Sequence, residues 1–190
     1  MIRIISCEYD ELTGLQSREY SFKIFEKAIK KSAFIHSKLT YVLIDIDFLF
    51  LVTYTFGYAE SDKYLTLIAK TIENTVTVKA EFIARVGGDE FGILFMDIDD
   101  ITVQKECEKI KNAIKNLKLL DGKTKNIDKT ISSELFKKIW DKGDFITISI
   151  AIFSKIAHED DTPDLFFAES AELLESIKLS SGYDSMVSNF

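Results

Sequence analysis

This 190-residue sequence has few of the residues that build a disulfide framework or a zinc site. It contains two cysteines, Cys7 and Cys107, which form no Cys-x-x-Cys pair, and two histidines, His36 and His158, which lie far apart. This excludes the disulfide-rich secreted class and a typical zinc centre. Any metal here should be a hard cation held by carboxylates. The cysteine usage favours a reducing, cytoplasmic setting.

The sequence also lacks a secretory signal, a membrane span and a basic net charge. Its most apolar stretch, 41–56, is shorter than the ~20 residues that a span needs and contains Asp45 and Asp47. Lys and Arg total 24 against 31 acids, a net charge of -7, which argues against a nucleic-acid polymer as partner. Hydrophobic residues make up 46%, enough for one domain with a core.

Hydrophobic periodicity predicts an α+β fold. Helices are expected at 19–37, 59–76, 101–120 and 163–179, and strands at 40–47, 81–86, 91–96 and 145–153. Asp161 or Thr162 would cap the last helix, with Pro163 at its first position. After the first helix the order is that of a split βαβ unit, so we expect an antiparallel sheet with helices packed on one face. The glycines at 87–88 should supply positive φ in the hairpin turn.

We expect a single domain over residues 1–190, with a short lead at 1–9 and an insertion at 121–144. Only nine residues precede Asp10, so no upstream sensor or coiled coil is expected in this sequence. The insertion has apolar residues at helical spacing and predicts a short helix over the body of the domain. Two interpretations stay open for it, a decorated surface loop and a helix that docks a partner.

Acidic residues occur at two points that the fold would bring together. Asp45 and Asp47 point to one face of a predicted core strand, and Asp89 and Glu90 follow Gly87 and Gly88 in the hairpin. One interpretation is structural: one strand carboxylate caps a turn, the other pairs with a basic residue, and the hairpin residues only shape the turn. If the first strand lies beside the hairpin, however, Asp45 and Asp89 would converge on one or two divalent cations that orient a nucleotide triphosphate.

Three motifs give the chain a family resemblance. Residues 85–91 read RVGGDEF, residues 10–15 read DELTGL with Arg18 following, and residues 43–48 read LIDIDF. The chain resembles the GGDEF domain of diguanylate cyclases over residues 10–182. The resemblance implies a polymerase-palm-like α+β fold and Mg²⁺ or Mn²⁺ as cofactor. It also implies two such domains as a homodimer, each holding one GTP, that form cyclic di-GMP and release pyrophosphate in bacterial second-messenger signalling.

The resemblance also assigns roles by position. The implied metal ligands are Asp45, the Ile46 carbonyl, Asp89 and Glu90, of which Asp89 and Glu90 are also catalytic. The implied substrate-binding residues are Phe48 and Leu49 through backbone amides, Thr53 and Asp62 for the base, Gly87 and Gly88 in the hairpin, and Lys178 for phosphate. A carboxylate at Asp62 suits guanine, whose N1–H and N2 amine both donate on one edge. Lys178 has a second interpretation, an ordinary solvated lysine.

The substrate pocket departs from the family pattern. Phe50 replaces a basic residue, Thr53 replaces a base-reading Asn, and Tyr183 replaces a phosphate-clamping Arg. Residues 78–81 read VKAE where relatives have the Arg-x-x-Asp of an inhibitory site, so we expect no inhibitory site. Three functions stay open: a diguanylate cyclase, a degenerate domain that binds nucleotide or a protein partner without turnover, and an enzyme with another triphosphate as substrate.

Overall fold

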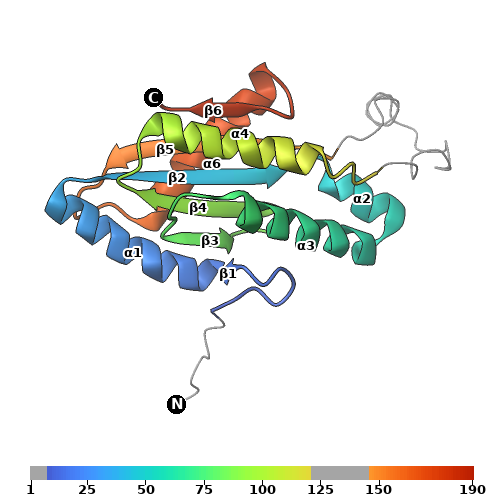
Figure 1. Ribbon diagram of the computed structural model, residues 1–190, viewed down its shortest axis with the longest axis horizontal. Coiled ribbons are helices and arrows are strands. Elements are labelled where there is room, and N and C mark those ends of the chain that lie inside the picture. The colour runs from blue at the N-terminus through green and yellow to red at the C-terminus, as the bar shows by residue number, and fades with distance from the viewer. Residues whose placement is uncertain (1–7, 121–145) are drawn as a thin grey trace, which may run out of the picture.

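The computed structural model describes residues 8–120 and 146–190, so the insertion at 121–144 and the first seven residues of the lead lie outside it. The described elements are β1 (Gln16–Ser17), α1 (Arg18–Ile35), β2 (Lys38–Ile46), α2 (Leu49–Phe56), α3 (Tyr58–Thr75), β3 (Phe82–Arg85), β4 (Glu90–Met96), α4 (Asp100–Lys115), β5 (Ile148–Ile156), α6 (Pro163–Ser180) and β6 (Met186–Ser188). They form one layered arrangement around a central sheet (Figure 1).

The sheet has the strand order β1-β3-β4-β2-β5-β6. Strand β4 lies between β2 and β3 and is antiparallel to both, and β5 pairs antiparallel with the other edge of β2. This confirms the split βαβ prediction. The short outer strands β1 and β6, which sequence periodicity did not predict, run parallel to their neighbours. The sheet is therefore mixed, with an antiparallel centre and parallel edges.

Helices cover both faces of this sheet, and the prediction of helices on one face holds for the two helices that belong to the split βαβ unit. Helices α3 and α4 lie on one face, and α1 and α6 lie on the other (Figure 1). Strand β2 shows the reason, because its side chains are buried in alternation on both sides. Ile44 belongs to the core cluster that contains Ile68 of α3, whereas Tyr41 packs against Phe25 of α1, which in turn contacts Phe166 of α6. A strand apolar on both faces needs a cover on each.

The helices and strands predicted outside the insertion are present, with differences at their ends, and the short helix predicted within 121–144 lies outside the described residues. Helix α4 ends at Lys115 rather than near 120, and Leu119 and Leu120 are buried beyond it. Strand β5 extends three residues past the predicted end. The predicted cap of α6 is confirmed, because the Thr162 hydroxyl accepts a hydrogen bond of 3.3 Å from the Leu165 amide and Pro163 opens the helix.

Helix α2 was missed in the sequence. It occupies the second half of the apolar stretch 41–56 and follows Phe48, whose left-handed backbone (φ 60°) separates it from β2. Its buried residues Leu49, Leu51 and Val52 have helical spacing, but eight residues give too short a period to stand out from the preceding strand.

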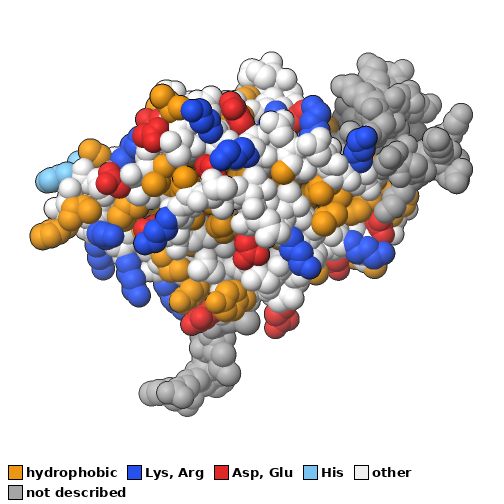
Figure 2. All heavy atoms as spheres, in the orientation of Figure 1, with side chains coloured by type: hydrophobic (Ala, Val, Ile, Leu, Met, Phe, Trp, Pro, Cys, Tyr) orange, Lys and Arg blue, Asp and Glu red, His pale blue; other side chains and the backbone are white. Residues whose placement is uncertain are grey.

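The surface of the face that carries α3 and α4 is mixed in charge. Lys, Arg and acidic side chains alternate there with apolar ones, without a continuous basic area over these two helices (Figure 2). Among residues 8–120 and 146–190, no helix is both long and apolar enough to cross a membrane.

Candidate active site

The register between β2 and β4 brings the two acidic segments together. Asp45 is paired across the sheet with Glu90, and the Ile46 amide donates a 3.0 Å hydrogen bond to the Asp89 carbonyl. Asp45 lies near the end of β2, and Glu90 is the first residue of β4. The structure therefore places these four predicted site residues beside one another at one end of the sheet.

The hairpin turn depends on Gly87 for space rather than for backbone freedom. Neither Gly87 nor Gly88 has positive φ, so that part of the prediction was wrong. A Cβ atom at Gly87 would lie 2.2 Å from Glu90 Oε2, whereas the same atom at Gly88 would meet nothing within 4 Å. The Glu90 side chain thus lies over the Gly87 backbone, and a Cβ atom at 87 would force the Glu90 carboxylate out of this position.

The carboxylates of the site influence one another electrostatically. Burial raises the pKa of Asp45, and the charges of Asp89 and Asp47 raise it further, against the opposing effect of Lys178. Burial and the charges of Asp45 and Asp89 also raise the pKa of Glu90. Like charges held this close favour either protonation or a bound cation.

Lys178 supplies a cation at this cluster. Its ammonium group, from the last turn of α6, donates a hydrogen bond to Asp45 Oδ1 and lies 3.9 Å from Asp47 Oδ1. It also lies 5.8 Å from the centroid of the Tyr183 ring. The sequence predicted a phosphate-binding or a solvated lysine here. The structure pairs Lys178 with a predicted metal ligand, as the structural interpretation of the strand carboxylates proposed for one of them, and its binding of phosphate stays a prediction.

Asp47 is a buried anchor for the C-terminal segment. Its carboxylate accepts hydrogen bonds from the hydroxyls of Thr147 (2.7 Å) and Ser149 (2.8 Å) and from the Asp184 amide (2.9 Å). No specific partner of Asp47 followed from the sequence. The available signal was that Thr147 and Ser149 alternate with isoleucine in a strand, but only the pairing of β5 with β2 shows that they face Asp47.

Two arginines, to which sequence analysis gave no role, hold the hairpin from the N-terminal side. Arg85 Nη2 donates to the Gly88 carbonyl at 2.7 Å, and Arg85 Nη1 lies 3.4 Å from the Asp10 carboxylate. Arg18 Nη1 donates to the Val86 carbonyl at 3.1 Å. Asp10 also accepts hydrogen bonds from the amide and the hydroxyl of Thr13. The DELTGL motif therefore forms a turn that is tied to the hairpin.

The predicted phosphate-binding residues lie at the start of α2, directly after β2. Phe48 precedes the first helical residue, Leu49, and within the described chain no side chain caps this helix. Amides at a helix N-terminus lack intrahelical partners and favour anions. The Phe48 ring packs on Tyr183, with centroids 4.0 Å apart. Thr53, farther along α2, donates its hydroxyl to the Leu49 carbonyl at 3.3 Å, so it is turned back toward its own helix.

Asp62 lies apart from the carboxylate cluster, on α3. It lines a surface cavity of about 510 Å³, together with Leu12, Lys63, Thr66, Leu67 and Lys70. The hydroxyl of Thr66 donates to the Leu12 carbonyl at 3.3 Å, which ties the DELTGL turn to this helix. None of the other lining residues was predicted as a site residue.

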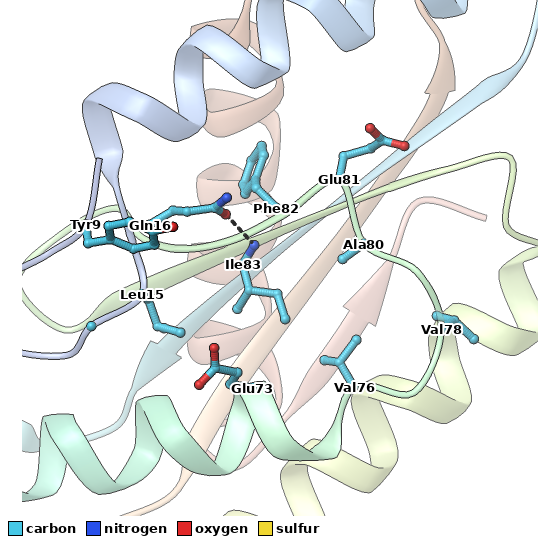
Figure 3. Close-up of a pocket in the computed structure, with 11 residues that line it drawn as sticks. Tyr9, Leu15, Gln16, Glu73, Val76, Val78, Ala80, Glu81, Phe82 and Ile83 are labelled. Atoms are coloured by element: carbon cyan, nitrogen blue, oxygen red, sulfur yellow. Dashed lines mark hydrogen bonds between the residues drawn. The ribbon is translucent and has the colours of Figure 1, made fainter. Parts of the chain in front are cut away.

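A second cavity lies beside residues 78–81, the segment in which relatives have the motif of an inhibitory site. It measures about 310 Å³ between the N-terminal turn, the end of α3 and the segment that leads to β3 (Figure 3). Val78, Ala80 and Glu81 line it, and Gln16 borders it while accepting a hydrogen bond from the Ile83 amide. Its lining residues include no Lys or Arg. The absence of an inhibitory site stays a prediction.

The donors present suit a magnesium-type cation bound together with a nucleotide. Among the described residues, no three His, Cys, Asp or Glu side chains are arranged to hold a metal by themselves. Mg²⁺ is commonly bound by one or two carboxylates plus substrate phosphates rather than by an all-protein cage. The carboxylates of Asp45 and Asp89 are brought close by the hydrogen bond from the Ile46 amide to the Asp89 carbonyl, and together with the Ile46 carbonyl they would provide such a partial set of hard oxygen donors. Asp45 already attracts one cation, the ammonium of Lys178.

A protein-family model described as "Diguanylate cyclase, GGDEF domain" matches residues 7–136. The chain belongs to the GGDEF domain family. The match includes the DELTGL turn, the end of β2 and the GGDEF hairpin, and so confirms the resemblance inferred from these motifs.

Curated relatives of this GGDEF chain include the probable diguanylate cyclase DgcJ of Escherichia coli, 29% identical over 108 residues, which are 57% of this chain and 22% of that protein. Diguanylate cyclase A of Treponema denticola is 29% identical over 122 residues, 62% of this chain and 33% of that protein. The aligned parts therefore span a third or less of these relatives.

Solved GGDEF structures share the fold. The GGDEF domain of DgcB from Caulobacter crescentus, in complex with c-di-GMP, matches with a TM-score of 0.71 at 18% identity, covering 99% of this chain and 96% of that one. Diguanylate cyclase SiaD from Pseudomonas aeruginosa, in complex with its activator SiaC, matches with a TM-score of 0.73 at 19% identity, covering 95% of this chain and 61% of that one. These likenesses confirm the α+β palm-like architecture.

Proposed function

We propose that this GGDEF domain condenses two GTP molecules into cyclic di-GMP and releases pyrophosphate, as a step in second-messenger signalling. One observation carries the proposal: the β2–β4 register places Asp45 opposite Glu90 and joins Ile46 to Asp89. This arrangement gathers oxygen donors at one end of the sheet, directly before the N-terminus of α2. The names of the curated relatives support the same chemistry.

In this proposal Asp45, Asp89, Glu90 and the Ile46 carbonyl hold Mg²⁺ or Mn²⁺. The bound cation would neutralise charge on the triphosphate and on the leaving pyrophosphate. Glu90 has a second role, to accept the proton of the attacking 3′-hydroxyl. A carboxyl group whose pKa is raised by burial and neighbouring charge is a stronger base than an exposed one, which suits Glu90 to that transfer.

The same proposal assigns the nucleotide to α2 and α3. Amides at Phe48 and Leu49 would bind phosphate, because these residues lie at the N-terminus of α2, where backbone amides and the helix dipole favour an anion. Asp62 would read the N1–H and N2 amine of guanine from its cavity of about 510 Å³, a volume typical of small-molecule sites. Thr53 adds little to base recognition, since its hydroxyl proton is directed to the Leu49 carbonyl. We therefore expect weak binding of the base.

Formation of cyclic di-GMP joins two nucleotides, so we propose that a second GGDEF domain, in a homodimer, supplies the second GTP. We place the reaction in the cytoplasm, where GTP and divalent cations are present together. Residues 1–190 are proposed to form one domain, with 121–144 as an insertion. No nucleic-acid polymer is proposed as partner, given the net charge of -7.

The test is incubation of the purified protein with GTP and Mg²⁺ or Mn²⁺, with product identification by chromatography and mass spectrometry. We expect cyclic di-GMP or its linear precursor, a rate that rises with the square of protein concentration at low occupancy of the dimer, and loss of product in Asp89→Ala. Stabilisation by GTP without any product at high protein concentration would instead support nucleotide binding without turnover. Absence of both effects would leave a protein-binding role.

A further inference from the structure

We propose that Lys178 is a built-in counter-ion of Asp45 that keeps a divalent cation from binding tightly until a nucleotide is present. The inference rests on the proposed function for the identity of the metal site. It adds that this domain binds metal and nucleotide cooperatively, and that one lysine of α6 sets the degree of cooperativity.

The contacts of Lys178 define this role. Its ammonium donates to Asp45 Oδ1, the oxygen donor that the metal would need, and its side chain is only 24% exposed. Asp47 lies 3.9 Å away but already accepts three hydrogen bonds, from Thr147, Ser149 and the Asp184 amide. Asp45 is therefore the principal anionic partner of the ammonium, and the two form a partly buried ion pair.

Tyr183 holds the ammonium from a second side. The ring centroid lies 5.8 Å from Lys178 Nζ, within the range of a cation–π contact, and the ring packs on Phe48 at 4.0 Å between centroids. Phe48 immediately precedes α2, where we propose that phosphate binds. The ammonium of Lys178 thus contacts Asp45, a proposed metal ligand, and Tyr183, whose ring packs on Phe48 next to the proposed phosphate site.

Competition follows from this position. A divalent cation that approaches Asp45 without nucleotide must displace the ammonium, which then loses its charged partner in a partly buried site, and this loss opposes binding. When a triphosphate arrives with the cation, the displaced ammonium gains a new anionic partner beside α2. The cost of displacement is then offset, so metal and nucleotide each increase the affinity for the other.

The experiment measures Mn²⁺ binding to the full chain without nucleotide, by electron paramagnetic resonance of free Mn²⁺. We expect the Lys178→Met variant to bind Mn²⁺ about tenfold or more tightly than the wild type, in keeping with loss of a charge-assisted hydrogen bond. Lys111→Met is the matched control: Lys111 is also 24% exposed, and it pairs at 3.1 Å with Asp184, whose amide bonds Asp47. It removes the same charge nearby but leaves Asp45 paired.

Three outcomes would overturn the inference: equal Mn²⁺ affinity in the wild type and Lys178→Met, equal tightening in Lys111→Met, or no Mn²⁺ binding in any variant. Lys178→Arg, which keeps a cation at Asp45, should bind Mn²⁺ as weakly as the wild type. Melting curves show whether each variant is folded. If Lys178→Met is unfolded, Lys178→Gln takes its place in the titration. This titration does not depend on turnover, so it separates the two proposals. If Lys178→Met binds Mn²⁺ more tightly but the wild-type protein forms no cyclic di-GMP, the proposed cyclase activity is refuted and the counter-ion role of Lys178 is supported.

Discussion

Removing the Ser149 hydroxyl should destabilise this protein more than removing a comparable hydroxyl from the same strand. Ser149 donates at 2.8 Å to the carboxylate of Asp47, whose side chain has no exposed surface. In Ser149→Ala this carboxylate loses one of three hydrogen bonds. Hydrogen bonds to charged groups contribute about 1.5–3 kcal/mol, so we expect a loss of that size in the free energy of unfolding.

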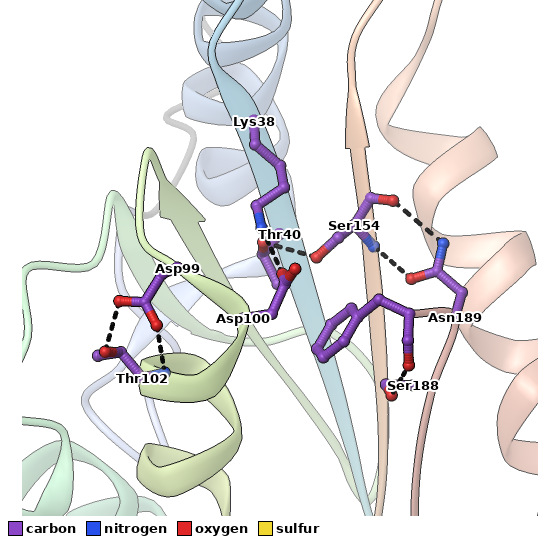
Figure 4. A network of polar contacts seen from close by, with 9 residues as sticks. Lys38, Thr40, Asp99, Asp100, Thr102, Ser154, Ser188 and Asn189 are labelled. Carbon is purple, nitrogen blue, oxygen red and sulfur yellow. Dashed lines mark hydrogen bonds and ion pairs between the residues drawn. The ribbon is translucent and has the colours of Figure 1, made fainter.

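Ser154→Ala is the matched control, because Ser154 is also in β5 but bonds a neutral partner. Its hydroxyl lies 2.7 Å from that of Thr40 at the half-buried end of the sheet, while its backbone groups pair with Asn189 (Figure 4). A neutral pair contributes about 0.5–1.5 kcal/mol, and water can replace part of it.

Urea unfolding and thermal unfolding, both followed by circular dichroism, measure the free energy of unfolding and the melting temperature of both variants. At about 2–4 °C per kcal/mol for a chain of this size, the expected fall in melting temperature for Ser149→Ala is about 3–12 °C. A loss in Ser149→Ala no larger than that in Ser154→Ala would refute the argument that Asp47 is a charged, buried anchor for β5 and the C-terminal segment.

Two further predictions concern acid stability and the hairpin. Burial raises the pKa of Glu106, but hydrogen bonds from Lys109 and from the amide and hydroxyl of Thr77 outweigh it and hold the pKa below its usual value. The stability that Glu106 contributes is therefore present above its unfolded pKa and lost as pH falls through the lower folded pKa. In Glu106→Gln the free energy of unfolding should therefore fall less steeply as the pH is lowered, as measured by urea titrations at successive pH values. Gly87→Ala should abolish cyclase activity with the fold retained, because the new Cβ displaces the Glu90 carboxylate, whereas Gly88→Ala has open space and should keep activity.

Each of these predictions has an outcome that contradicts it. An acid limb that is equally steep in Glu106→Gln would show that other carboxyls account for the pH dependence. Equal cyclase rates in the two glycine variants, measured with folded protein, would show that the position of Glu90 over Gly87 is not needed for the reaction.

The sequence by itself determined the local features of this protein. The apolar period of α1, the Thr162 cap and Pro163 start of α6, and the GGDEF hairpin each depend on residues within a few positions of one another. The family also followed from short motifs, because the GGDEF hairpin and the DELTGL turn each consist of consecutive residues. These patterns were sufficient to propose Asp45, Asp89 and Glu90 as one site.

Only the tertiary structure decided which distant residues meet. Asp45 and Glu90 are 45 positions apart, and Asp45 and Lys178 are 133 apart, so strand register and the packing of α6 fix these pairs. A shift of one residue in register would turn every side chain of a strand to the opposite face, and no local sequence pattern specifies which register forms. The cover on both faces of the sheet, the anchoring of Asp47 by β5 and the counter-ion at Asp45 all depend on that long-range choice.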